Sequence, residues 1–161
     1  HAAAQAVLKQ QFLRHEPERV YQAIVYGHPM PPSGTWRDTL VWDQRSLIQK
    51  ETHPRDPRGQ EEISEYRVVE RYGDASLIEV RLVTGKRNQI RIQARLRGHT
   101  LVGEQRYIFG PAEMRPIDFS RQALHAARLT ISHPATGRAL TFEAPLPQDL
   151  KELIAELRRS V

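Results

Sequence analysis

The sequence predicts an α+β fold built on a mainly antiparallel, mixed sheet with flanking helices. Strand-like segments outnumber helical ones, and neighbouring strands are joined by short turns, which is typical of antiparallel pairing. Helical periodicity of the apolar residues is confined to three segments. The length of 161 residues is that of one compact domain, so we predict a single domain over residues 1–161.

The strands are recognised by runs of β-branched and aromatic residues or by strict alternation. Val20–Tyr26 is a short apolar run of this kind. Residues 65–71 and 76–83 both alternate, and Gly73-Asp74 between them is a hairpin signature. Strands are therefore expected at residues 20–26, 35–42, 65–71, 76–83, 124–131 and 138–143.

Three segments predict helices. Residues 2–14 carry apolar side chains on one helical face, and residues 87–96 have an apolar stripe that would point inward. Pro147 opens a last helix whose apolar side chains recur at i, i+3, i+4, i+7 and i+11. These side chains are Leu150, Leu153, Ile154, Leu157 and Val161.

The segment from Asp43 to Glu62 shows no such period. It is polar and contains two prolines and a glycine. We therefore expect residues 43–62 to form a long, mobile polar loop.

Composition and charge indicate which kind of partner the protein binds and in which compartment it acts. The formal net charge of +5 and the pI near 9.9 favour a polyanionic partner such as RNA. The sequence contains no cysteine, no apolar run long enough to span a bilayer and no secretory signal. We therefore expect a cytoplasmic protein that is not associated with a membrane. The seven histidines show no zinc-ligand spacing, so no metal site is expected.

The densest cluster of chemically informative residues begins where a predicted strand ends, at Thr84-Gly85. The free N–H groups of a helix that starts there would favour an anion. No acidic residue lies between Arg81 and Gly103 to neutralise the cations that follow. A solvated charged helix face is the plainer interpretation. The cations are Lys86, Arg87, Arg91, Arg95 and Arg97.

Four motifs, in order along the chain, resemble those of the RluA-type family of RNA pseudouridine synthases. Leu82–Gln93 follows the family's L-x-T-G-R-x-H-Q-I-R-x-H, and Gly98–Tyr107 follows its G-H-P-x-x-G-D-x-x-Y. Leu124–Gly137 matches the later L-H-A-x-x-L-x-x-x-H-P-x-x-G, and Arg19–Gly27 matches K-x-Y-x-A-x-V-x-G near the start. The agreement covers almost the whole chain.

The resemblance implies the fold of that catalytic domain and an isomerase of specific uridines in ribosomal or transfer RNA. Such enzymes use no cofactor and flip the target base out of the stack. Tyr21 matches the tyrosine that stacks on the flipped base and takes part in proton transfer. Arg91 matches the arginine that pairs with the catalytic aspartate, and Ile90 would form an apolar wall. The expected RNA contacts are Lys86, Arg87, Asn88 and Arg95.

Some positions depart from the family pattern. Lys86, Asn88 and Gln93 stand where the family has Arg, His and His, and Glu104 replaces its Asp. Lysine keeps the charge but loses bidentate phosphate geometry.

The family's R-L-D-x-x-T-S-G motif, which carries the nucleophilic aspartate, occurs nowhere in the 161 residues. We therefore expect the chain to be the later part of a catalytic domain and to be inactive alone. The alternative is a non-catalytic RNA-binding module or degenerate homologue, and the gene sequence upstream of His1 would distinguish the two. A basic ribosomal or structural protein would explain the charge but not the ordered motifs.

Overall fold

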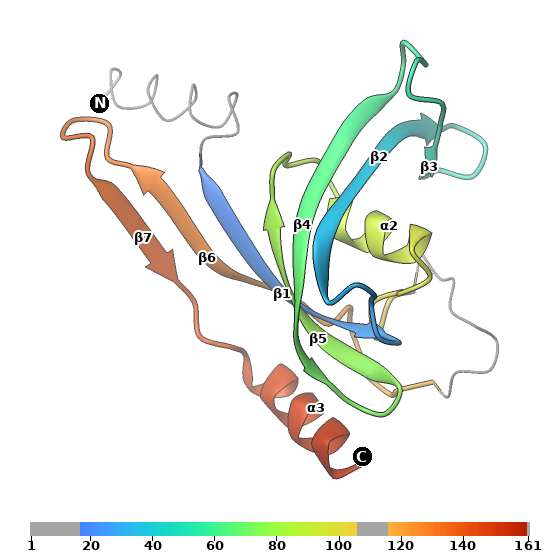
Figure 1. Cartoon of the computed structure of the whole chain (residues 1–161), viewed down its shortest axis with the longest axis vertical. Helices are drawn as coiled ribbons and strands as arrows, with labels where there is room; N and C mark the ends of the chain where they lie inside the picture. Colours follow the sequence, from blue (N-terminus) through green and yellow to red (C-terminus); the bar gives the residue numbers. More distant parts are fainter. Residues whose placement is uncertain (1–16, 106–115, 161) are drawn as a thin grey trace.

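The computed structural model describes residues 17–105 and 116–160. Its centre is a seven-stranded sheet in the order β3-β2-β4-β5-β1-β6-β7, in which every strand pair is antiparallel. Two helices flank it (Figure 1), which confirms the predicted α+β class. The elements are β1 Glu18–Tyr26, β2 Ser33–Asp43, β3 Ile48–Glu51, β4 Gln60–Arg71, β5 Ala75–Leu82, α2 Gln89–Leu96, β6 Leu124–Ser132, β7 Ala139–Glu143 and α3 Gln148–Arg159.

The middle of the sheet is covered on both faces, which explains the apolar run in β1. Successive side chains of a strand point to opposite faces. Ala23 and Val25 accordingly lie in one core cluster with Ile90 of α2. Ile24 lies in the other cluster, with Leu153 of α3. The two helices therefore pack on opposite faces, and they stand well apart in Figure 1.

The expected loop at residues 43–62 is wrong as a description of the whole segment. It contains β3, which pairs with the end of β2, and its last residues already belong to β4. The strand was missed because it has only four residues, which do not alternate between buried and exposed. Local bonds shape the turn between β2 and β3: Asp43 accepts hydrogen bonds from Arg45 N and Ser46 Oγ.

The middle helix begins two residues later than predicted, at Gln89. Asn88, the residue before it, has a left-handed backbone with φ 60°. The strand therefore does not lead directly into a helix after Gly85, because a short loop follows it. The other expected strands and the last helix are confirmed within a few residues, and the helix expected at residues 2–14 lies outside the described residues.

Candidate active site

A pocket of about 160 Å³ opens on the α2 face of the sheet. β1, β5, the loop before α2, α2 itself and the start of β6 all contribute to its wall. Five of the seven predicted site residues line it, whereas Arg87 and Arg95 do not. Its lining consists of Tyr21, Leu82, Lys86, Asn88, Gln89, Ile90, Arg91, Gln122 and Leu124.

Tyr21 forms the β1 side of this pocket. Its ring is half-buried and packs against the core cluster that contains Leu82 and Ile90. Ile90 lines the same pocket and is only 4% exposed, so this part of the wall is apolar and belongs to the core. A pocket that combines an aromatic ring with an apolar wall suits a planar base.

Arg91 is held by a carboxylate of this chain. Its Nε and Nη2 donate to the two oxygens of Glu104, each at 2.7 Å, and its Nη1 donates to Asn88 Oδ1 at 3.0 Å. The Glu104 side chain is 0% exposed and that of Arg91 17%. This fork geometry is the strongest form of charge-assisted pair, and it fixes the guanidinium at the pocket wall.

Glu104 was expected only as a departure from the family pattern, and its pairing with Arg91 was not predicted. The preceding Gly103 has φ +80°, and a Cβ there would lie 1.8 Å from the carbonyl oxygen of Arg121. Only glycine permits this turn, which carries the carboxylate back to α2. The Gly-Glu pair in place of Gly-Asp was the available signal.

Two of the cations in and next to α2 are neutralised by acidic side chains. Besides the pair at Arg91, Arg97 forms an ion pair with Asp38 of β2. The expectation of an unneutralised stripe is wrong for these two residues because their acidic partners are distant in sequence.

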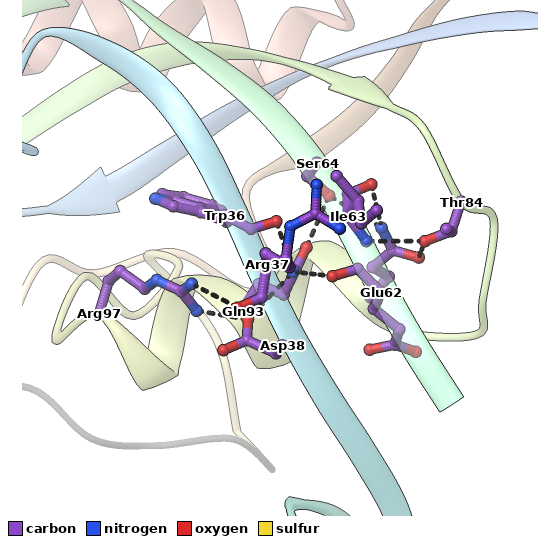
Figure 2. A network of polar contacts seen from close by, with 10 residues as sticks. Trp36, Arg37, Asp38, Glu62, Ile63, Ser64, Thr84, Gln93 and Arg97 are labelled. Atoms are coloured by element: carbon purple, nitrogen blue, oxygen red, sulfur yellow. Dashed lines mark hydrogen bonds and ion pairs between the residues drawn. The ribbon is translucent and has the colours of Figure 1, made fainter. Parts of the chain in front are cut away.

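A buried polar network fixes α2 to β2 and β4 (Figure 2). Gln93, which is 0% exposed, donates to the carbonyl oxygens of Trp36 and Glu62 and accepts from Ser64 Oγ. One turn earlier, Gln89 donates to the Ile63 carbonyl oxygen and to Ser64 Oγ. Gln93 therefore holds the helix that presents Ile90 and Arg91, and it does not face the pocket.

The loop before α2 is attached to the same network. Gln89 Oε1 accepts from Thr84 Oγ1 at 2.8 Å and from Lys86 N at 3.0 Å. Thr84 Oγ1 in turn accepts from Ile63 N. These bonds fix the backbone that carries Lys86 at the pocket.

Glu62 lies beside this network and is 2% exposed. Its Oε2 is buried and has no hydrogen-bond partner in the part of the chain that the structure describes. Burial, together with the negative charge of Asp38, raises the pKa of the Glu62 carboxyl to about 7, against the opposing effect of Lys86. The carboxyl therefore changes its charge close to neutral pH.

The predicted RNA contacts divide into two groups. Lys86 and Asn88 line the pocket, although the Asn88 side chain is turned toward Arg91. Arg87 is exposed and Arg95 is half-buried, both outside the pocket lining.

Within residues 17–105 and 116–160, no group of three or more His, Cys, Asp or Glu side chains is placed to hold a metal ion. Neither α2 nor α3 is long and apolar enough to cross a membrane.

The chain belongs to the RNA pseudouridylate synthase family, whose model matches residues 1–96. It is 37% identical to an uncharacterized RNA pseudouridine synthase of Chlorobaculum parvum, over 96% of this chain and 51% of that protein. It is 36% identical to the ribosomal large subunit pseudouridine synthase D of Zymomonas mobilis, over 96% of this chain and 49% of that protein. The chain thus spans about half the length of these curated relatives.

Solved structures agree on the fold. Human RNA pseudouridylate synthase domain containing 4 superposes with a TM-score of 0.76 at 18% identity, covering 95% of this chain and 67% of that one. Human RNA pseudouridylate synthase domain containing 1 gives a TM-score of 0.73 at 21% identity, covering 98% of this chain and 72% of that one. The sheet and its helices are therefore those of a pseudouridylate synthase domain.

Proposed function

We propose that the protein containing this chain is an RNA pseudouridine synthase that isomerises specific uridines in ribosomal or transfer RNA. The observation that carries the proposal is the convergence of Tyr21, Ile90 and Arg91 on one pocket. These residues come from β1 and α2. They are the three to which the family resemblance assigns catalytic roles.

In this proposal the target uridine leaves the RNA stack and its base enters the pocket. The uracil stacks on the Tyr21 ring, and Ile90 forms the apolar wall. Isomerisation breaks the bond from ribose C1′ to N1 of uracil and joins C1′ to C5. C5 then loses its proton and N1 gains one, so the product has the same composition as uridine. The Tyr21 hydroxyl is suited to take part in that proton transfer, and no cofactor is required.

The nucleophilic aspartate is not among the described pocket residues. Because the R-L-D-x-x-T-S-G motif is absent from the 161 residues, we expect these residues to be inactive alone. Arg91, held by Glu104, would orient the aspartate's carboxylate from the α2 side and keep it ionised. Lys86, Arg87, Asn88 and Arg95 would contact the RNA. We further propose that the enzyme acts in the cytoplasm.

The test is to map pseudouridine in ribosomal and transfer RNA from cells that lack the gene. We expect one or a few positions to lose the modification and to regain it when the full-length gene is returned. A gene in which Tyr21 is replaced by phenylalanine should not restore them. If no position changes while the purified protein still binds RNA, the protein is instead a non-catalytic RNA-binding module.

A further inference from the structure

Arg19 lies in β1 two residues before Tyr21, and both residues line a second pocket of about 330 Å³. Residues i and i+2 of a strand share a face, so the Arg19 side chain is on the α2 side of the sheet. The Tyr21 ring borders both this pocket and the candidate active site. Arg19 is therefore placed next to the proposed position of the uracil.

The Arg19 guanidinium rests on Gly85. A Cβ at residue 85 would lie 1.9 Å from Arg19 Nη1, 2.4 Å from Nη2 and 2.5 Å from Cζ. The guanidinium thus occupies the space that a side chain at residue 85 would take, and a larger residue there would have to displace it. The contact fixes the arginine head between β1 and the loop that carries Lys86.

No acidic side chain in residues 17–105 or 116–160 pairs with this guanidinium. Its Nε is buried without a hydrogen-bond acceptor, and no ion pair forms at Arg19 among the residues that the structure describes. Other partly buried arginines are paired: Arg97 with Asp38, Arg121 with Asp149 and Arg128 with Glu18. The pocket wall contains Arg19 and the already paired Arg128 against one acid, Glu143.

A fixed, half-buried cation with unused donors is unfavourable unless an anion binds it. Burial has already restricted its rotamers, so an oxyanion would bind with little further loss of entropy. Arginine can donate two parallel hydrogen bonds to a phosphate. The open pocket gives a phosphate access to the guanidinium from the solvent side.

We propose that Arg19 binds a backbone phosphate of the nucleotide whose base lies against Tyr21. Two residues along a strand span about 7 Å, which is within the reach of a single nucleotide. The proposal rests on the proposed function because it places uracil against Tyr21. It assigns Arg19 a positioning role: it would hold the flipped nucleotide through its phosphate.

The experiment measures binding of uridine, uridine 5′-monophosphate and uridine 3′-monophosphate to the full-length protein by titration calorimetry or NMR. We expect one monophosphate to bind at least about 10-fold tighter than uridine, as a charged hydrogen-bonded pair would give. Arg19→Gln should abolish this preference, and Arg19→Lys should keep part of it. Arg67→Gln, which removes an exposed cation from β4, is the matched control and should bind like the wild type.

The proposal is overturned if the wild type shows no preference for either monophosphate, or if Arg19→Gln retains the preference. Arg19→Lys guards against a folding defect in the glutamine variant. These binding measurements do not depend on catalytic turnover. The proposed function is tested separately by mapping pseudouridine, so the two proposals can fail independently.

Discussion

Tyr21 is the side chain to which our proposal gives the most direct part in the chemistry. Replacing it with phenylalanine keeps the ring and its packing but removes the hydroxyl. We expect turnover of the full-length enzyme to fall by roughly 10²–10⁴-fold, the range of a lost proton-transfer group, while RNA affinity stays nearly unchanged. Assays of pseudouridine formation and filter binding would measure the two quantities.

Tyr26→Phe provides a matched control on the same strand. Its hydroxyl accepts a hydrogen bond from Ile117 N, and its ring packs in the cluster on the other face of the sheet. This variant should retain activity. Near-normal turnover in Tyr21→Phe would exclude the proton-transfer role.

Glu104 acts through Arg91 in our proposal, so its replacement tests positioning. Glu104→Gln should leave a buried guanidinium without its carboxylate, which costs about 3–5 kcal/mol of folding free energy. We expect kcat to fall more than KM rises, because Arg91 would orient the catalytic carboxylate. Glu104→Asp, the residue of the family motif, should restore much of both. Equal loss in the Gln and Asp variants would show that Glu104 only fills space.

At the scale of elements, the loop between β5 and α2 contributes to both pockets: Lys86 lines one, and Gly85 contacts Arg19, which lines the other. Gly85→Ala tests the second contact, because the new methyl group would displace the Arg19 guanidinium, the movable end of a long side chain. The fold should therefore survive, while the preference for a uridine monophosphate over uridine drops several-fold. Gly73→Ala, where nothing lies within 4 Å, should leave that preference unchanged.

The same loop carries the cations expected to meet RNA. Replacing Lys86 and Arg87 with alanine should weaken RNA binding and flatten its salt dependence, by about 0.7–0.9 per lost phosphate contact in the log–log slope. Replacing the exposed Lys151 and Arg159 of α3 removes the same charge on the other face of the sheet and should leave the slope unchanged. Equal slopes in both double variants would place the RNA elsewhere.

Structure that is encoded by neighbouring residues could be predicted from the sequence, whereas contacts between distant residues could not. The β4–β5 hairpin was predicted because its turn and its alternation are encoded within a few neighbouring residues. The pairing of Arg91 with Glu104 was not, since it depends on a turn at Gly103 that no local pattern reveals. Similarly, Gln93 was compared with a family histidine, but its partners in β2 and β4 lie up to 57 residues away.

For the whole molecule, the two faces of the antiparallel sheet differ. The α3 face holds an apolar cluster that includes Leu150, Leu153 and Leu157. The α2 face combines an apolar cluster with the polar network and the candidate pocket. Both faces therefore contribute to stability, whereas the candidate pocket lies on the α2 face alone, and changes at α3 should affect activity mainly through folding.

The ionisation of Glu62 links the polar network of the α2 face to global stability. The pKa of its carboxyl is raised from 4.5 to about 7 in the folded protein. Between these pH values the folded state keeps a proton that the unfolded state has lost, so stability falls as pH rises toward 7 and levels off above it. Glu62→Gln should remove this contribution.

We therefore expect the free energy of unfolding of Glu62→Gln, measured by urea denaturation, to vary less than that of the wild type between pH 5 and 8. At pH 8 the variant should be the more stable protein, because the wild type then holds a buried ionised carboxylate where the variant holds a neutral amide. Glu61→Gln is the control, because the neighbouring carboxylate is exposed and paired with Arg37. Parallel curves for the wild type and Glu62→Gln would mean that the Glu62 carboxyl titrates normally and that the network contributes no pH dependence.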